Sequence, residues 1–290
     1  MANPYAPNER FIAPARGRTR PGQFIVSALL VFIGWSFLRD VLLLPLNRAE
    51  GIGLTRWSFV LELSAFALLV FILDRVLWRS YGRRWTSALG DPGRLLPDFA
   101  RVLAGCLALY SFFLLLGFDG SGAMQRPIGA WLAFLPVALV GIALQTGAEE
   151  VFFRGFLHQY AATLFKSPIL WMGGPALAFG LVHAANDPSS AAAIFSYVAW
   201  TTAFAVACID LTARTGSIGA AWGLHLSVNM AALTVATSEG APMSAAALFV
   251  YPAQPETMPA PDPSLLLYGL IFELAFLAVL WLMARNMIAR

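Results

Sequence analysis

The chain has 290 residues, of which 59% are hydrophobic and 12% are charged, and its formal net charge is +3. This composition, with a mean hydropathy of +0.69, leaves too little polar surface for a water-soluble globule and predicts a membrane protein. The arginines lie mainly at the ends of apolar segments, so they bear on membrane orientation and give no support for nucleic-acid binding.

Apolar segments of about 20 residues, the length that a transmembrane helix needs, recur along the chain between short polar breaks. Residues 1–23 are predicted to be a disordered basic tail, and residues 24–284 a single transmembrane domain. The predicted fold class is all-α, a polytopic membrane protein with about eight transmembrane helices. The predicted spans are 24–46, 57–78, 99–118, 128–165, 168–185, 192–212, 217–237 and 264–284, with a Pro-rich loop at 238–263 and a tail at 285–290.

Most arginines and lysines fall on one side of this arrangement, whereas the opposite loops hold only Arg48, Arg56 and Arg126. The positive-inside rule then places both termini in the cytoplasm. We therefore expect an integral protein of the cell inner membrane, with cytoplasmic tails at 1–23 and 285–290.

Two adjacent carboxylates and an arginine interrupt the apolar fourth span, at Glu149, Glu150 and Arg154. A charge at the centre of a membrane helix costs about 2.5–3.5 kcal/mol on insertion scales, so this placement requires compensation. On an α-helix, Glu150 and Arg154 share a face, whereas Glu149 is turned by about 100° from Glu150. A pair that only locks helices together explains Glu150 and Arg154 but not Glu149, which is the candidate for acid–base chemistry.

His183 and His225 also lie within predicted spans. Glu149 lies 17 residues before Lys166 and His183 lies 17 residues after it, so an antiparallel hairpin would place them at the same depth. His225 and Asn229 are four residues apart and project from one helix face. On the same span, glycines and alanines give a small surface for close helix packing.

Together these residues could perform hydrolysis. Glu149 with His183 would activate a water molecule, and His225 with Asn229 would donate hydrogen bonds to the developing oxyanion. Two histidines and a carboxylate are also a catalytic zinc set, although no H-E-x-x-H motif is present. A proton relay of a transporter, or an interhelical lock in a scaffold, is the alternative outside the enzymes, although we see no inverted repeats.

Three motifs follow one another in the predicted fourth, fifth and seventh spans: Glu149-Glu150-Val-Phe-Phe-Arg154, Phe179-Gly-Leu-Val-His183 and His225-Leu-Ser-Val-Asn229. In this order they resemble the family of CAAX proteases and bacteriocin-processing enzymes (CPBP), which includes the type II CAAX prenyl endopeptidases. The resemblance covers about residues 128–237 and implies a catalytic core on those three spans.

The resemblance implies an intramembrane endopeptidase, a hydrolase that cleaves a membrane-embedded, lipidated or prenylated peptide within the lipid bilayer. It implies that Glu149 is the catalytic carboxylate, that His183 helps it to activate water, and that His225 and Asn229 stabilise the oxyanion. Glu150 and Arg154 would support the site. From its position one turn before His183, Phe179 is interpreted either as a wall of the site or as an ordinary lipid or core contact. The family is described both as metalloproteases and as metal-independent glutamate proteases. We favour the mechanism without a cofactor and keep zinc as the alternative.

Overall fold

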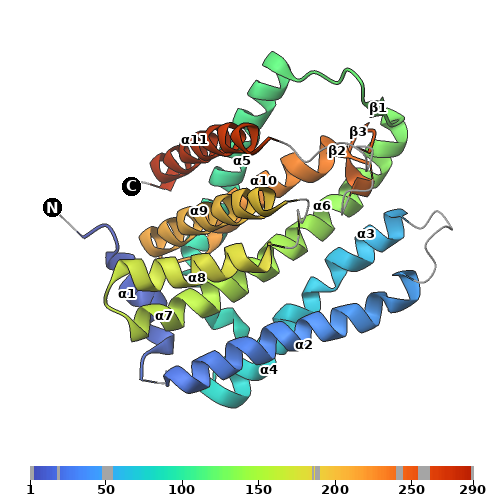
Figure 1. Cartoon of the computed structure of the whole chain (residues 1–290). Helices are drawn as coiled ribbons and strands as arrows, with labels where there is room; N and C mark the ends of the chain where they lie inside the picture. The colour runs from blue at the N-terminus through green and yellow to red at the C-terminus, as the bar shows by residue number, and fades with distance from the viewer. Residues whose placement is uncertain are drawn as a thin grey trace.

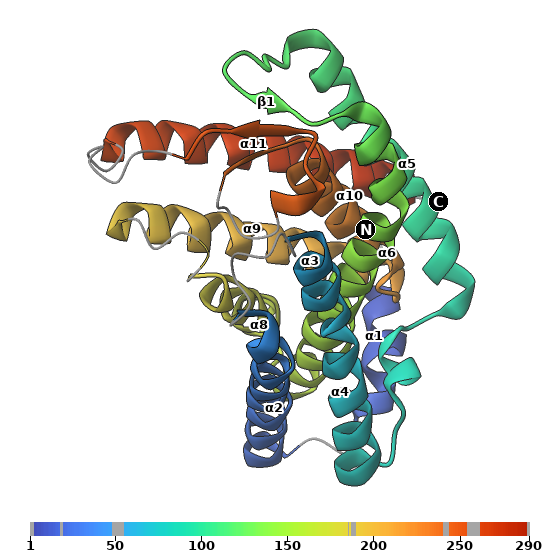
Figure 2. The same cartoon turned by 90° about the vertical axis from the view of Figure 1, so that its right-hand side faces the viewer.

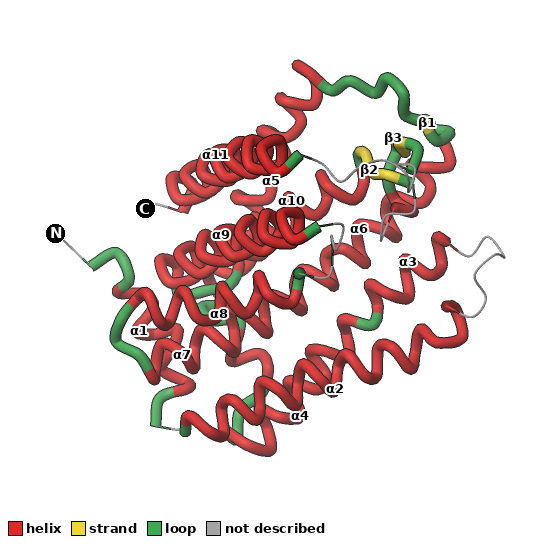
Figure 3. Tube along the Cα trace, viewed as in Figure 1, coloured by secondary structure: helices red, strands yellow, loops and turns green. Residues whose placement is uncertain are grey.

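In the computed structural model, the described residues are 3–17, 20–47, 55–184, 186, 190–239, 244–253 and 262–288. Most of these residues belong to helices, and the few strand residues among them lie at one end of the bundle (Figure 3). The predicted all-α class is confirmed. The Pro-rich loop predicted at 238–263 and the predicted tail at 285–290 lie partly outside the described residues.

Five helices among the described residues are long and apolar enough to cross a membrane. They are α2 (Pro21–Asn47), α5 (Pro92–Gly117), the continuous helix Ile128–Leu164, α9 (Ala191–Thr215) and α11 (Pro263–Ile288). The continuous helix is composed of α6 (Ile128–Glu150), the π-helical segment η3 (Val151–His158) and α7 (Gln159–Leu164). At about 1.5 Å per residue it is longer than the bilayer is thick, as the sequence predicted for the fourth span.

Shorter helices occupy the other three predicted spans. The second span is divided into α3 (Thr55–Ser64) and α4 (Phe66–Tyr81), the fifth is α8 (Pro168–Val182), and the seventh is α10 (Gly219–Thr234). The polytopic helical architecture is therefore confirmed, whereas the number of eight crossings stays a prediction because these helices are shorter than a full span.

The N-terminal segment is not a disordered tail over its described residues. Helix α1 (Ala6–Ile12) and the 3-10 turn η1 (Ala13–Ala15) pack against α7 and α9. Phe11 and Ile12 are buried there, and the Tyr5 hydroxyl donates a hydrogen bond of 2.7 Å to Asp210 Oδ1 on α9. The prediction of disorder is wrong because these apolar residues give α1 a buried face that a purely basic tail would lack.

Close packing around α10 depends on two glycines one turn apart. A Cβ atom on Gly219 would lie 2.1 Å from Leu95 O, and one on Gly223 would lie 2.5 Å from Phe99 O. Both carbonyls belong to α5, so the absence of side chains lets the two backbones meet. The predicted small surface on the seventh span is thus its contact with α5.

The two ends of the bundle carry different structural elements. Both chain termini lie at one end, close to α1 and to the last turns of α9 and α11 (Figures 1 and 2). At the other end β1 (Met124–Gln125) pairs antiparallel with β3 (Phe249–Tyr251), and β2 (Ala236–Ser238) pairs parallel with β3. Next to this sheet lies a 3-10 turn, η4 (Ser244–Ala246). The sequence analysis did not predict these strands.

Candidate active site

The buried charges lie where the long fourth helix changes its hydrogen-bonding pattern. Glu149 and Glu150 are the last residues of α6, and η3 begins at Val151. A π-helix bonds each residue to one five positions away, and such segments are frequent at functional sites. Ordinary α-helical spacing therefore describes the side-chain directions up to Glu150 but is not a sufficient guide from Val151 to His158.

Glu150 is completely buried and contacts two partners through one carboxylate oxygen. Its Oε1 lies 2.9 Å from Arg154 Nη1 as an ion pair and 2.8 Å from His225 Nδ1. The ion pair predicted from the spacing of the two charges is confirmed. The contact with His225 was not predicted, and it means that Glu150 orients a histidine of α10 in addition to neutralising Arg154.

Aromatic rings surround the guanidinium of Arg154, which is also completely buried. Its Cζ lies 4.6 Å from the ring centroid of Phe179 and 5.9 Å from that of Phe204. Several of its nitrogens have no hydrogen-bond partner among the described residues. The ion pair with Glu150 and these cation–π contacts therefore compensate the buried charge.

Phe179 connects the arginine to both histidines. Its ring centroid lies 4.4 Å from that of His183 and 5.9 Å from that of His225. Of the two interpretations given to Phe179 from the sequence, a wall of the site or an ordinary core contact, these distances favour the wall.

Only one of the two carboxylate oxygens of Glu149 has a hydrogen-bond partner among the described residues. Its Oε1 accepts a hydrogen bond of 2.8 Å from Gln145 Nε2. Its Oε2 has no hydrogen-bond partner among the described residues and lies 3.6 Å from His225 Nε2. A buried carboxylate oxygen without a hydrogen bond is costly unless something else occupies the position next to it, so Oε2 is the atom available to a water molecule.

Gln145 is the site residue that the sequence analysis missed. It lies one turn before Glu149 on α6, and its Oε1 accepts a hydrogen bond of 2.9 Å from Asn229 Nδ2. Asn229 therefore reaches Glu149 through Gln145. The spacing of four residues between Gln145 and Glu149 is the sequence signal that could have found it.

Two hydrogen bonds define how the histidine rings are presented. His183 lies at the C-cap of α8, and its Nδ1 is 2.7 Å from the Phe179 carbonyl oxygen, so Nδ1 carries the hydrogen and Nε2 keeps the lone pair that can accept one. His225 Nδ1 donates to Glu150, which turns its Nε2 towards Glu149. No contact between His183 and Glu149 is found among the described residues, so the direct neighbour of Glu149 is His225 rather than the predicted His183.

A cavity of about 520 Å³ brings these groups together. It is bounded by α2 and the α3–α4 pair on one side and by α8, α9 and α10 on the other. Glu150 and Arg154 lie behind its wall. The residues of the site that line the cavity are Gln145, Glu149, Phe179, His183, His225 and Asn229.

His158 does not take part in this group. On a regular α-helix, its position four residues beyond Arg154 would place it on the same polar face. In the structure it is completely buried, its ring is stacked on Trp171 with centroids 5.2 Å apart, and Phe11 of α1 lies 5.5 Å away. His158 thus joins α1, η3 and α8 at the end of the bundle where the termini lie.

The donor groups do not fit a zinc site in this arrangement. Catalytic zinc needs about three protein ligands within roughly 2.0–2.2 Å of one point. Among the described residues, no three His, Cys, Asp or Glu side chains are grouped in a way that could hold a metal ion.

The fold and the site together define a polytopic helical membrane protein with acid–base groups of the hydrolytic type in one intramembrane cavity. Residues 127–231 match the family described as Type II CAAX prenyl endopeptidase Rce1-like. This match covers the region that holds all three motifs and confirms the resemblance to CAAX proteases.

A second comparison gives a relative from a bacterium. The uncharacterized protein YyaK of Bacillus subtilis (strain 168) is 39% identical over 103 residues, which are 34% of this chain and 32% of YyaK. The match therefore spans about a third of either protein. No solved structure matches the chain.

Proposed function

We propose that the chain is an intramembrane endopeptidase in which Glu149 is the general base. The observation that carries the proposal is the free Oε2 of Glu149, which is buried at a cavity wall beside His225 Nε2 and lies in the Rce1-like region. A carboxylate with one oxygen fixed by Gln145 and the other facing the cavity is suited to remove a proton from a water molecule.

In the proposed reaction, the water lies between Glu149 Oε2 and the free Nε2 of His183. Glu149 takes a proton as the water oxygen attacks the carbonyl carbon of the scissile peptide bond. The proton then passes to the leaving nitrogen while the C–N bond breaks, giving a carboxylic acid and an amine. His183 acts as a hydrogen-bond acceptor that orients the water, which agrees with its Nδ1–H tautomer.

The oxyanion is stabilised by His225 and Asn229 in this proposal. Glu150 accepts a hydrogen bond from His225 Nδ1 and so orients the ring. With both ring nitrogens protonated, His225 can donate its Nε2–H to the oxyanion. Asn229 uses one amide hydrogen for Gln145 and has a second one to donate. The assignment of both residues made from the sequence is therefore retained, with Gln145 added as the residue that positions Glu149.

The proposed substrate is a membrane-embedded or lipidated peptide, prenylated peptides included. The cavity wall combines the polar groups with Phe32, Trp35 and Trp200, so it offers apolar surface for a hydrophobic side chain or lipid chain. This surface supports a membrane-associated substrate.

The rival functions differ in measurable ways. A zinc peptidase would lose activity on chelation and regain it with zinc, whereas we expect chelation to leave cleavage unchanged. A transporter or scaffold would not cleave any membrane-anchored peptide. The site geometry favours the peptidase, because a helix lock does not require the free oxygen of Glu149.

The test is cleavage of membrane-anchored peptides by the purified full-length protein in detergent or liposomes. We expect Glu149→Gln to abolish cleavage and His183→Ala to reduce it strongly. Glu273→Gln is the matched control, because Glu273 is an exposed glutamate of α11 outside the cavity. Cleavage by Glu149→Gln at the wild-type rate would refute the assignment of the general base.

A further inference from the structure

The catalytic cavity lies towards one end of the bundle. In α2, which begins at Pro21, its lining residues are 32–39, in the middle and second half of the helix. In α9, which begins at Ala191 at the opposite end, they are 197–204, in the first half and the middle. Because the two helices run in opposite directions, both sets lie in the same half of the bundle, away from the chain termini.

Helices α8 and α10 agree with this position. The cavity contacts α8 only in its last turn, at Phe179, Val182 and His183. In α10 it is lined by residues 225–233, from the middle of the helix to its C-terminal end. Both helices begin at the end of the bundle where the termini lie, so the catalytic groups face the other end.

The end that carries the termini is the arginine-rich one. Its described basic residues include Arg10, Arg16, Arg20, Arg79, Arg83, Arg84, Arg94, Lys166, Arg214 and Arg285, whereas the opposite end carries the described Arg39, Arg56 and Arg126. An excess of arginine and lysine in short connections marks the cytoplasmic side. The cavity then lies in the extracytoplasmic half of the membrane.

Packed residues close the cytoplasmic end below the site. Arg83 Nη2 donates a hydrogen bond of 2.7 Å to Gln159 Oε1, and Gln159 Nε2 donates one of 2.8 Å to the Phe11 carbonyl. Together with the stacked His158 and Trp171, these bonds fix α1 and the 3-10 turn η2 (Trp85–Ala88) against η3 and α7. Little room is left for a peptide to pass from this end to Glu149.

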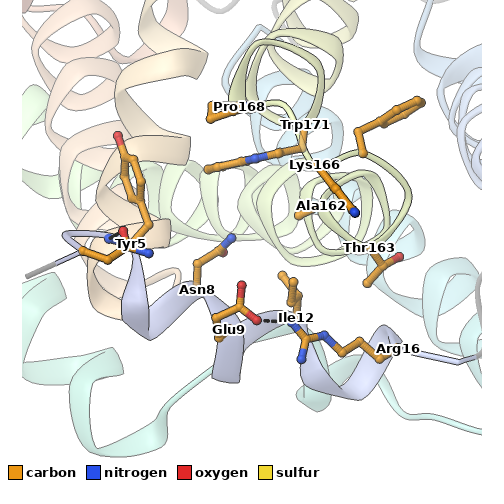
Figure 4. A pocket seen from close by; sticks show the side chains of 12 residues that line it. Tyr5, Asn8, Glu9, Ile12, Arg16, Ala162, Thr163, Lys166, Pro168 and Trp171 are labelled. Atoms are coloured by element: carbon orange, nitrogen blue, oxygen red, sulfur yellow. Dashed lines mark hydrogen bonds and ion pairs between the residues drawn. The ribbon is translucent and has the colours of Figure 1, made fainter.

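A second cavity, of about 450 Å³, lies at the cytoplasmic end but is separate from the first. Figure 4 shows its polar lining, in which Glu9 and Arg16 form an ion pair near Asn8 and Lys166. It shares no lining residue with the catalytic cavity. It therefore does not lead to the candidate catalytic groups.

Polar groups stand at the extracytoplasmic edge of the catalytic cavity. Arg39 of α2, Glu62 of α3 and Asn186, which follows α8, all line it. Asn186 Nδ2 donates a hydrogen bond of 3.3 Å to the Tyr197 hydroxyl. Such a rim admits water and the polar main chain of a peptide, which an apolar rim would exclude.

We propose that the substrate reaches Glu149 from the extracytoplasmic side of the membrane. This inference rests on the proposed peptidase function and narrows its substrate class to exported peptides or to membrane segments whose cleavage site lies in the outer half of the bilayer. A prenylated protein held at the cytoplasmic surface is then not the substrate.

The test is cysteine labelling of the full-length chain with a membrane-impermeant maleimide. Ser36→Cys and Asn186→Cys report on the cavity and its rim, and Lys166→Cys is the matched control at the opposite end. The parent chain gives the background, because Cys106 and Cys208 are buried. We expect both cavity variants to react in right-side-out spheroplasts and to lose labelling in inverted vesicles, with the reverse for Lys166→Cys.

Labelling of the two cavity variants only in inverted vesicles would overturn the proposal and favour a cytoplasmic, prenylated substrate. Two variants are used so that failure of one to fold does not remove the test. If Ser36→Cys cleaves peptides, labelling it from outside should abolish that cleavage, because Ser36 lines the cavity. If the unlabelled protein cleaves nothing, the peptidase function fails, while the labelling pattern still determines the side on which the cavity opens.

Discussion

His225 Nδ1 lies 2.8 Å from Glu150 Oε1, so the carboxylate that neutralises Arg154 also orients the ring whose other nitrogen faces Glu149. The two adjacent glutamates thus act on opposite sides of one histidine. Glu150 is bound on the inner side, among buried charges, and Glu149 lines the cavity. The two adjacent carboxylates therefore have different contacts, one with the buried arginine and one with the cavity.

Replacing Glu150 should test this relationship. In Glu150→Gln, Arg154 stays buried without a counter-ion, and breaking a buried ion pair costs about 3–5 kcal/mol of folding free energy. Thermal unfolding in detergent should therefore show a large loss of stability, accompanied by loss of cleavage.

The double variant Glu150→Gln/Arg154→Met separates stability from catalysis. Removing both buried charges is often neutral for stability, so the melting temperature should recover towards that of the wild type. The rate of cleavage should stay low, because a neutral amide accepts a weaker hydrogen bond from His225 Nδ1 than a carboxylate does and orients the ring less firmly. Recovery of both stability and kcat in the double variant would show that Glu150 serves only to neutralise Arg154.

Gln145 positions Glu149, so its replacement should lower kcat more than it changes KM. The variant Gln145→Leu removes the hydrogen bond to Glu149 Oε1 and leaves Asn229 without its acceptor. A hydrogen bond to a charged group contributes about 1.5–3 kcal/mol, so kcat should fall by about ten- to a hundredfold with a smaller change in KM.

The control is Gln23→Leu, which removes a hydrogen bond to the Ser80 carbonyl at the N-terminal end of α2, far along the helix from the cavity. Its kcat should equal that of the wild type. An equal loss in both variants would mean that Gln145 matters only for folding.

The sequence predicted the helical class and the pairing of Glu150 with Arg154 because both depend on local rules: apolar segment length and a spacing of four residues. It did not predict the contact of His225 with both glutamates, or the hydrogen bond between Asn229 and Gln145, because these contacts join residues that are about 75 to 84 positions apart. The same limit applies to His158. Local spacing placed it beside Arg154, whereas the π-helical turn and the packing of α1 determine its stacking on Trp171.

The contact of α10 with α5 should be sensitive to one added methyl group. A Cβ on Gly219 would overlap the Leu95 carbonyl, so Gly219→Ala should lose about 1–3 kcal/mol of stability and displace α10, which carries His225. The matched control is Gly269→Ala in α11, where a Cβ meets nothing within 4 Å. Because alanine favours a helix over glycine by up to about 1 kcal/mol, the control should be neutral or more stable. Equal melting temperatures for the two variants would contradict the close approach of α10 and α5.

Docking of α1 depends on the hydroxyl of Tyr5. Partial burial and the hydrogen bond to Asp210 raise the pKa of Tyr5 above its ordinary value of 10. A raised pKa in the folded state means that the contact stabilises the fold below about pH 10 and is lost as the pH rises through the higher value.

Tyr5→Phe removes the contact at every pH, so trypsin should cleave at Arg10 faster than in the wild type. Tyr268→Phe, on an exposed position of α11, is the control and should not change the rate. If raising the pH above 10 accelerates cleavage in Tyr5→Phe as much as in the wild type, ionisation of Tyr5 is not what releases α1.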